Sequence, residues 1–287
     1  MSSPTLQRFL RNRAACIGAG LVALLGSIAM IGPWLVSHDP DVSDFAHGQA
    51  ALGMPAGPSR YHWLGTDTLC RDILSRVVFG ARISLSTALL ATALAIAIGT
   101  LVGLVAGSTH DTRLRAIDEL LMRVVDAGLS FPYLLLVMAL GAALDRTDLT
   151  SMVIVLGATG WLGTSRVVRA KAIQLRQLDF VVAARALGQR PHVIMLRHVL
   201  PNLTGPLVVT TSASVATMIL AESVLSYLQV GVQPPTATWG RMLRDGQGFF
   251  TADPRLVIVP AIAILLAVLG FNLLGEGLRD ALDPQGS

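Results

Sequence analysis

The chain has 287 residues, of which 53% are hydrophobic and 14% are charged, and its mean hydropathy is +0.62. Soluble proteins carry roughly 25% charged residues, so this composition excludes an ordinary soluble domain. The formal net charge of +4 does not indicate a nucleic-acid-binding protein, because the basic residues, all arginine except Lys171, gather in loops between apolar runs, where membrane topology explains them.

The first apolar run follows a basic N-terminal segment that contains Arg8, Arg11 and Arg13. The run, residues 14–36, is longer than the core of a signal peptide, which has about 7–15 apolar residues. We therefore expect residues 1–13 to be a cytoplasmic segment and residues 14–36 to be an uncleaved first transmembrane helix.

Five further apolar runs predict membrane-spanning helices, since about 20 mostly apolar residues cross a bilayer as a helix. They are continuous, whereas the strands of a membrane barrel alternate. The six expected spans are residues 14–36, 83–107, 127–144, 149–165, 203–229 and 256–275. The predicted fold class is all-α, a polytopic membrane protein with six transmembrane helices surrounded by membrane lipid.

The outer segments between these runs are expected to be ordered. In residues 72–80 apolar side chains recur at helical spacing, which predicts a helix lying on the membrane surface within an outer loop 37–82. A proline-rich stretch, 232–235, precedes a second ordered segment, 236–250, in which Trp239 is expected at the membrane interface.

Small residues line one face of the second predicted span. Gly99, Gly103 and Gly107 recur every four residues, a spacing that lets another helix approach closely. The approaching helix can belong to the same chain or to a partner subunit, and both readings stay open.

Two acidic residues fall in or beside apolar spans, where an unpaired ionised group costs several kcal/mol. For Asp126 the favoured reading is a pair with Arg123, one helical turn earlier, and the alternative is a place on the translocation route of a charged cargo. Glu222 has two open readings, a structural role near the end of a span and a place on the translocation path of a charged cargo.

The loop 166–200 determines the expected orientation. It contains seven basic side chains and a single acid, Asp179, and positively charged loops stay on the cytoplasmic side of a membrane. This orientation puts both termini in the cytoplasm and residues 37–82 and 230–255 outside, in a cell inner membrane. Within the loop, Ala183 and Ala184 favour a short helix, Gly188 ends it, and a proline blocks its continuation.

The same loop resembles the "EAA" loop of permease subunits in ATP-binding-cassette (ABC) importers. The matching residues are Ala183, Ala184, Gly188, Leu200 and Pro201, and Val182 stands in place of the family's glutamate. The chain after about Tyr61 also resembles the C-type permease subunit of the dipeptide/oligopeptide group. The segments that carry this likeness are His62–Asp67, Arg71-Asp72, Gly80–Ser84, Gln233–Pro235, Trp239-Gly240 and Asn272–Pro284. Cys70 departs from the usual glycine.

The resemblance implies a type I ABC importer permease fold with its core in residues 83–287, and import of short peptides by alternating access. It also reaches permeases for nickel and haem. The implied partners are a second homologous permease subunit, two ATP-binding subunits or one fused ATPase, and an extracytoplasmic substrate-binding protein. The implied ATPase-coupling residues are Ala183, Ala184, Arg185, Gly188, Leu200 and Pro201.

Motifs for catalysis are missing from the sequence. Lys171, the one lysine, lies in Arg169-Ala-Lys-Ala172, so no phosphate-binding Walker A motif exists. No GxSxG elbow and no metal-ligand spacing of histidine or cysteine occurs. We expect no catalytic residue, metal or cofactor. A secondary transporter or channel would also have six spans but would not need the EAA-like pattern, and an intramembrane enzyme would need a nucleophile–base pair or metal ligands within the spans.

Overall fold

The structure is a computed structural model that describes residues 4–50, 53–144 and 148–282. Helices are the regular elements of these residues, apart from two isolated β-bridges. In chain order they are α1 (Pro4–Arg11), α2 (Arg13–Leu35), α3 (Ile73–Thr109), α4 (Arg115–Leu129), α5 (Tyr133–Ala142), α6 (Leu149–Leu175), α7 (Asp179–Ala186), α8 (Pro191–Ile194), the π-helical turn η2 (Met195–Val199), α9 (Leu200–Asn202), α10 (Thr204–Tyr227), α11 (Trp239–Gly246), the 3₁₀ turn η3 (Gln247–Phe249) and α12 (Arg255–Leu282).

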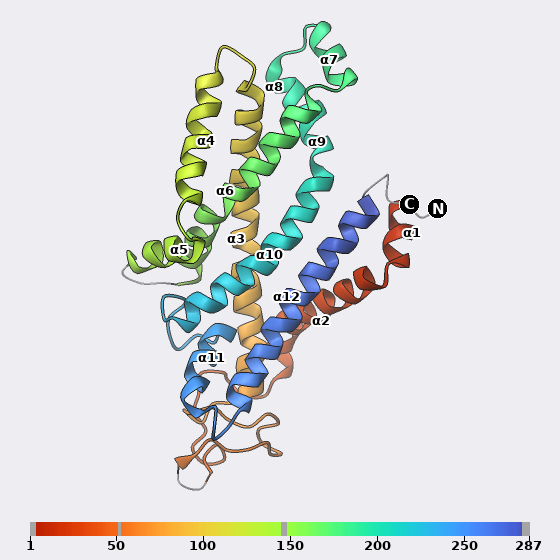
Figure 1. Cartoon of the computed structure of the whole chain (residues 1–287). Helices are drawn as coiled ribbons and strands as arrows, with labels where there is room; N and C mark the ends of the chain where they lie inside the picture. The colour runs from red at the N-terminus through yellow and green to blue at the C-terminus, as the bar shows by residue number, and fades with distance from the viewer. Residues whose placement is uncertain (1–3, 51–52, 145–147, 283–287) are drawn as a thin grey trace.

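Five of these helices, α2, α3, α6, α10 and α12, are long and apolar enough to cross a membrane. A sixth span is present if α4 and α5, which are bent by 88° at a short break, count as one. The predicted all-α, multi-pass architecture is therefore confirmed. Long α3 extends through the molecule, with α7 and α8 near one end and the α2–α3 connection (residues 36–72) near the other (Figure 1).

The third predicted span differs from a straight helix over 127–144. Helix α4 begins at Arg115, and the chain turns at Ser130–Pro132 before α5 begins. Proline has no N–H to donate and disfavours helical backbone in the residue before it. The Ser130 N–H closes the end of α4 on the Asp126 carbonyl at 3.0 Å. The sharp bend therefore follows from local chemistry within an apolar run.

The prediction of a separate helix at 72–80 was wrong, because these residues form the first turns of α3. The Asp72 carboxylate caps the helix by accepting the Ser75 N–H at 2.7 Å. Gly80 does not break it but lets Trp239 approach, since an added Cβ would lie 3.1 Å from the indole. Trp239 is fully buried instead of lying at a membrane interface, and its Nε1 donates to the Val77 carbonyl.

Two packed layers of helices form the core. Helices α3 and α6 lie side by side, and α10 joins them through buried Ala88, Ala95 and Ile219. Helix α2 packs along α12, where Gly18 brings the two backbones together because an added Cβ would lie 2.8 Å from Leu273 Cβ. This paired unit leans against α3 and α10 (Figure 1).

Candidate functional site

The arginine-rich loop, defined here as residues 176–203, contains the predicted short helix as α7. The Gly188 N–H donates to the Arg185 carbonyl at 3.0 Å, and the Gln189 N–H donates to the Ala184 carbonyl at 3.2 Å. These two bonds form a Schellman motif, which requires left-handed backbone at its central residue. Gly188 has φ +77°, so glycine ends α7 as predicted.

One face of α7 is anchored in a small apolar core. Val181 and Ala184 are buried on that face. The core joins α7 to the ends of α3, α6 and the following turns through Leu104, Val168, Ala172, Ile194, Met195, Val199 and Leu203. Because residues from five helical segments, α3, α6, α7, α8 and η2, pack together there, movement of α7 is coupled to the ends of α3 and α6.

The opposite face of α7 is open. Val182 is 49% exposed, Leu187 is 82% exposed and Phe180 is 43% exposed. An exposed apolar patch on a short, anchored helix is typical of a docking surface. The position where the resembling family carries glutamate, Val182, thus lies on the accessible face of α7.

The chain leaves α7 through α8, η2 and α9. Pro191 begins α8, and Pro201 lies in α9 just after the π-helical turn. Proline has no N–H with which to continue the α-helical hydrogen bonds. The Leu200 N–H donates to the Met195 carbonyl, five residues earlier, which is the π-helical pattern. Leu200 packs against the apolar core, whereas Pro201 is exposed. His198 Nε2 lies 3.0 Å from Gln189 Oε1, and this contact joins η2 to the residues that follow α7.

A cavity of about 240 Å³ separates α7 from the turn after α3. Arg176 and Arg185 line it together with Asp111. The Arg176 guanidinium donates to the Gly107 carbonyl at 2.5 Å, and burial, followed by the nearby charge of Arg185, lowers its pKa below the ordinary arginine value. Arg185 itself is exposed, so its charge is available at the surface.

Ion pairs fasten α4 to α6 near the same end of the molecule. The Arg169 guanidinium donates to both oxygens of the buried Asp118 carboxylate, at 2.6 and 2.7 Å, and His110 Nδ1 lies 2.8 Å from the same carboxylate. Asp126 pairs with Arg166 of α6, so the predicted pairing with Arg123 was wrong. The long-range partner is available because α4 turns alongside α6.

The glycine-lined face of α3 packs within the chain. A Cβ added at Gly99 would lie 2.7 Å from Thr164 Cβ, and one at Gly103 would lie 2.6 Å from the Ser165 carbonyl oxygen. At Gly107 it would lie 2.8 Å from Ala172 Cβ. All three neighbours belong to α6, which supports the intramolecular reading of the glycine spacing.

Glu222 is fully buried between α10, α3 and α11. Its Oε1 accepts a hydrogen bond from Ser226 Oγ at 2.8 Å, and Ser223 Oγ lies 3.5 Å from the other oxygen. This hydroxyl-lined packing favours the structural reading of Glu222. Its place on a translocation path stays a prediction.

A larger cavity, of about 350 Å³, opens where α4 and α5 bend away from α6 and α10. Gly163 of α6 leaves open space beside it, and the hydroxyl residues that line it are Tyr133, Thr159, Thr210, Ser214 and Thr217. No charged side chain lines it among the described residues. Sequence reasoning missed this cavity because its walls depend on how α4 and α5 pack against α6 and α10.

The backbone conformation at Cys70 explains why the resembling family usually has glycine at this position. Cys70 has φ +58°, in the left-handed region where glycine is favoured, and it is buried. The turn around it is held by Asp67, whose carboxylate accepts the backbone N–H of Arg71 at 3.0 Å and its Nε at 2.8 Å. The family's glycine therefore marks a backbone conformation that this chain retains with a different residue.

Comparison with protein-family models gives two matches. The model described as "Binding-protein-dependent transport system inner membrane component" matches residues 99–285. The model described as "N-terminal TM domain of oligopeptide transport permease C" matches residues 3–53. The first match covers more than half of the chain and contains the arginine-rich loop.

Characterised relatives match along nearly the whole chain. The dipeptide transport system permease protein DppC of Alkalihalophilus pseudofirmus is 38% identical over 96% of this chain and 87% of its own. The oligopeptide transport system permease protein OppC of Bacillus subtilis is 36% identical over 97% and 88%. The glutathione transport system permease protein GsiD of Escherichia coli is 38% identical over 97% and 89%.

Among solved structures, a chain of the MetNI methionine ABC transporter in an inward-facing crystal form has a similar fold. The TM-score is 0.57 at 16% sequence identity, and the match covers 72% of this chain and 96% of that one. The likeness concerns the fold alone, and it agrees with the predicted type I importer architecture.

Proposed function

The chain belongs to the family of binding-protein-dependent transport system inner membrane components, and we propose that it is the C-type permease subunit of an importer for short peptides. Membership makes it a multi-pass membrane subunit that works with ATPase and permease partners. The peptide cargo is supported by the dipeptide, oligopeptide and glutathione permeases to which the chain is similar over nearly its full length.

The observation that carries the mechanism is α7, held on one face and open on the other. A separate ATP-hydrolysing subunit would dock on the face that exposes Val182 and Leu187. The buried contacts of Val181 and Ala184 would then transmit its movement to α3 and α6. ATP and its hydrolysis products can drive this switch only through their different affinities for the two states. Arg185, Gly188, Leu200 and Pro201 shape and present the docking helix.

Membership of this family supports the proposed partners. We infer a heterodimer with a second homologous permease chain, two ATP-binding subunits or one fused ATPase, and an extracytoplasmic substrate-binding protein that delivers the cargo. The cavity beside Tyr133, Thr159 and Thr217 would be this subunit's share of the translocation path. Its uncharged hydroxyls suit the amide groups that all peptides share, which lets side chains vary.

The proposed orientation places the arginine-rich loop and both termini in the cytoplasm, with the α2–α3 connection outside the inner membrane. Single cysteines at positions 60 and 190, in a chain lacking Cys16 and Cys70, test it. A membrane-impermeant maleimide should label position 60 in intact cells and leave position 190 unlabelled. Labelling at 190 in preference to 60 would invert the topology and remove α7 from the ATPase side.

Reconstitution tests the function. The chain purified alone should show no ATPase activity, because it has no Walker A motif. Co-expressed with its neighbouring permease, ATPase and binding-protein genes and placed in liposomes, it should support ATP-dependent uptake of a radiolabelled dipeptide. Omission of this chain is the control. Peptide uptake that is unchanged without the chain, or robust ATP hydrolysis by the chain alone, would contradict the assignment.

A further inference from the structure

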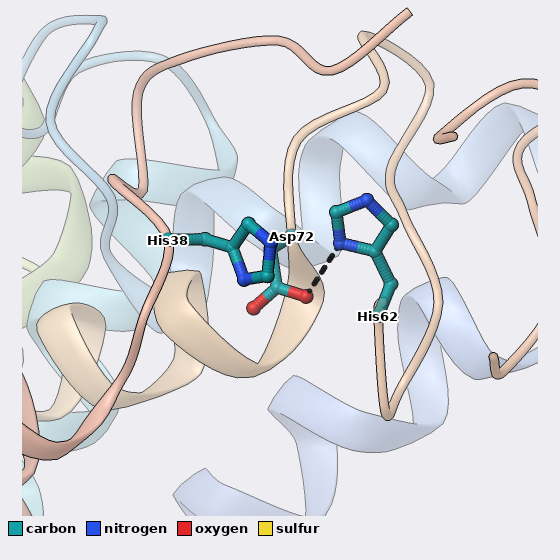
Figure 2. A group of neighbouring side chains, drawn as sticks. All are labelled: His38, His62 and Asp72. Carbon is teal, nitrogen blue, oxygen red and sulfur yellow. Dashed lines mark hydrogen bonds and ion pairs between the residues drawn. The ribbon is translucent and has the colours of Figure 1, made fainter. Parts of the chain in front are cut away.

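The α2–α3 connection folds three potential metal ligands into one place, although they are far apart in the sequence. His38 follows the end of α2, His62 lies in the middle of the connection, and Asp72 caps α3. One ligand atom from each residue lies within 4.8 Å of those of the other two (Figure 2). The His38 and His62 rings are 4.7 Å apart between centroids.

His62 is 1% exposed and lies between two carboxylates. Its Nδ1 is 3.0 Å from Asp72 Oδ1, the contact drawn in Figure 2. Its Nε2 faces Asp44 Oδ2 at 3.4 Å and makes no hydrogen bond among the described residues. The other Asp72 oxygen is already used as the cap of α3, which leaves Oδ1 for a ligand.

A cavity of about 110 Å³ adjoins the cluster, lined by His38, Asp72 and Ser75. Ser75 Oγ is buried and has no hydrogen-bond partner in the described part of the chain. A cavity of this size has room for an ion and a water molecule. Buried polar atoms such as this hydroxyl ordinarily form a hydrogen bond with a buried water when no protein partner is near. Two unpartnered polar atoms and a neighbouring cavity are thus concentrated at one small cluster.

We propose that His38, His62 and Asp72 bind a divalent transition-metal ion, with Zn²⁺ as the best match to two imidazoles and a carboxylate. Zinc takes such ligands in tetrahedral geometry at about 2.0–2.2 Å, which separates neighbouring ligand atoms by about 3.4 Å. The Nδ1–Oδ1 pair, 3.0 Å apart, needs to open by a few tenths of an ångström, and the other ligand pairs, which lie within 4.8 Å, need to close by at most about 1.4 Å. A water from the cavity would complete the coordination.

Asp44 has the place of a supporting residue in this site. With Nδ1 of His62 bound to the metal, the proton sits on Nε2 and points toward Asp44 Oδ2. Carboxylates that accept the second N–H of a metal-bound histidine fix its tautomer and orientation. Asp44 is itself held in place, because its Oδ1 accepts the backbone N–H groups of Ala46 and His47.

The ion would clamp the end of α2 to the start of α3 across a connection in which the described residues form no α-helix. This role does not depend on the cargo that the importer carries. In the rival arrangement no metal is present, and the His62 ring simply lies between Asp72 and Asp44. The two differ in one measurable property, the binding of one metal ion per chain.

The test uses the full chain, co-purified with its partners on a tag without histidine. Inductively coupled plasma mass spectrometry should find about one more zinc ion per copy of this chain in the wild-type complex than in the complex that carries His38→Ala. After chelator treatment, Zn²⁺ should rebind with one-to-one stoichiometry and raise the melting temperature, and Co²⁺ should give a visible d–d absorption band that His38→Ala loses. His38 is only half-buried, so its alanine variant is expected to fold, which gel filtration checks.

Two further variants separate a built site from adventitious binding. Asp44→Asn keeps the Oδ1 acceptor but removes the negative charge, and it should weaken Zn²⁺ binding about 10- to 100-fold, as loss of a supporting carboxylate does. His192→Ala changes an exposed histidine at the opposite end of the molecule, in α8, and should keep one zinc per chain. No zinc or cobalt binding by the wild-type complex, or equal binding by His38→Ala, would overturn the metal site and leave His62 as a metal-free contact between Asp72 and Asp44.

Discussion

Replacement of Gly188 by valine should disconnect ATP hydrolysis from transport. Gly188 has φ +77°, and an added Cβ would find no neighbour within 4 Å, so the cost of a side chain there comes from the backbone alone. Left-handed backbone costs an L-residue about 1–2 kcal/mol, and a β-branched residue is a severe outlier in that region. A loss of that size lowers the population of the native turn about 5- to 30-fold relative to its unwound alternatives.

The assay is ATP-dependent dipeptide uptake and ATPase activity of the reconstituted complex, measured on the same preparations. Gly188→Val should insert into the membrane normally, because the turn lies outside the long apolar helices. Uptake should fall, by at most about 5- to 30-fold, because the population of the native turn cannot change by more than its ratio to the alternatives. Either the ATPase subunits should be recovered in smaller amounts, or hydrolysis should continue without transport.

Asparagine is the matched control, because it tolerates left-handed backbone better than other residues with a Cβ. Gly188→Asn should retain most of the uptake that Gly188→Val loses. Equal uptake by the valine variant and the wild type would refute the argument that the Schellman turn holds α7 in its docking position. Equal loss in both variants would show that the glycine is needed for close contact with a partner, and not for its backbone conformation.

The remaining predictions concern packing, ion pairing, thiol reactivity and docking. Gly103→Ala should destabilise the purified chain by about 1–3 kcal/mol in thermal unfolding in detergent, because it overpacks α3 against α6. Gly20→Ala, whose added Cβ meets no neighbour, should leave stability unchanged or raise it. Equal melting temperatures of the two variants would contradict this. Arg169→Gln, which leaves the buried Asp118 carboxylate with only a histidine contact, should cost about 3 kcal/mol in the same assay, against about 0–1 kcal/mol for the exposed pair broken by Arg166→Gln. Burial raises the pKa of the Cys70 thiol, so maleimide labelling of Cys70 should be slow at neutral pH and keep accelerating above the pH at which an exposed thiol levels off; a rate equal to that of a free thiol would refute the burial. Ala184→Asp places a charge in the apolar core under α7 and should abolish uptake, whereas Val182→Glu on the exposed face should be tolerated; normal uptake by Ala184→Asp would mean that this core does not transmit movement.

The long spans could be predicted from the sequence because the bilayer requires continuous apolar helices. The limits of α2 and α10 agree with the predicted 14–36 and 203–229 within two residues. The end of α7 was equally accessible, since Gly188 followed by a proline leaves few alternatives to a left-handed turn. In each case a local residue pattern determines the local structure.

Features that depend on distant neighbours could not be predicted in this way. Asp126 had a plausible partner one turn away, but the bend at Pro132 brings α4 alongside α6 and supplies Arg166 instead. The 72–80 segment has the amphipathic spacing of a surface helix, but other segments of the chain bury its polar face. Arg76, for example, is enclosed near Asp67 and Asp245. Hydrophobic periodicity indicates which face is apolar, but it does not reveal whether protein covers the polar face.

Helix α3 has a mechanical consequence. Its 37 residues form one unbroken rod of about 55 Å at 1.5 Å per residue, which exceeds the roughly 30 Å of bilayer hydrocarbon. One end is capped by Asp72 in the α2–α3 connection, and the other contributes Leu104 to the core beneath α7. A tilt of about 1° displaces one end of such a rod by about 1 Å relative to the other. The stiffness of α3 therefore converts a small push on one side of the membrane into a displacement on the opposite side, with no unfolding between them.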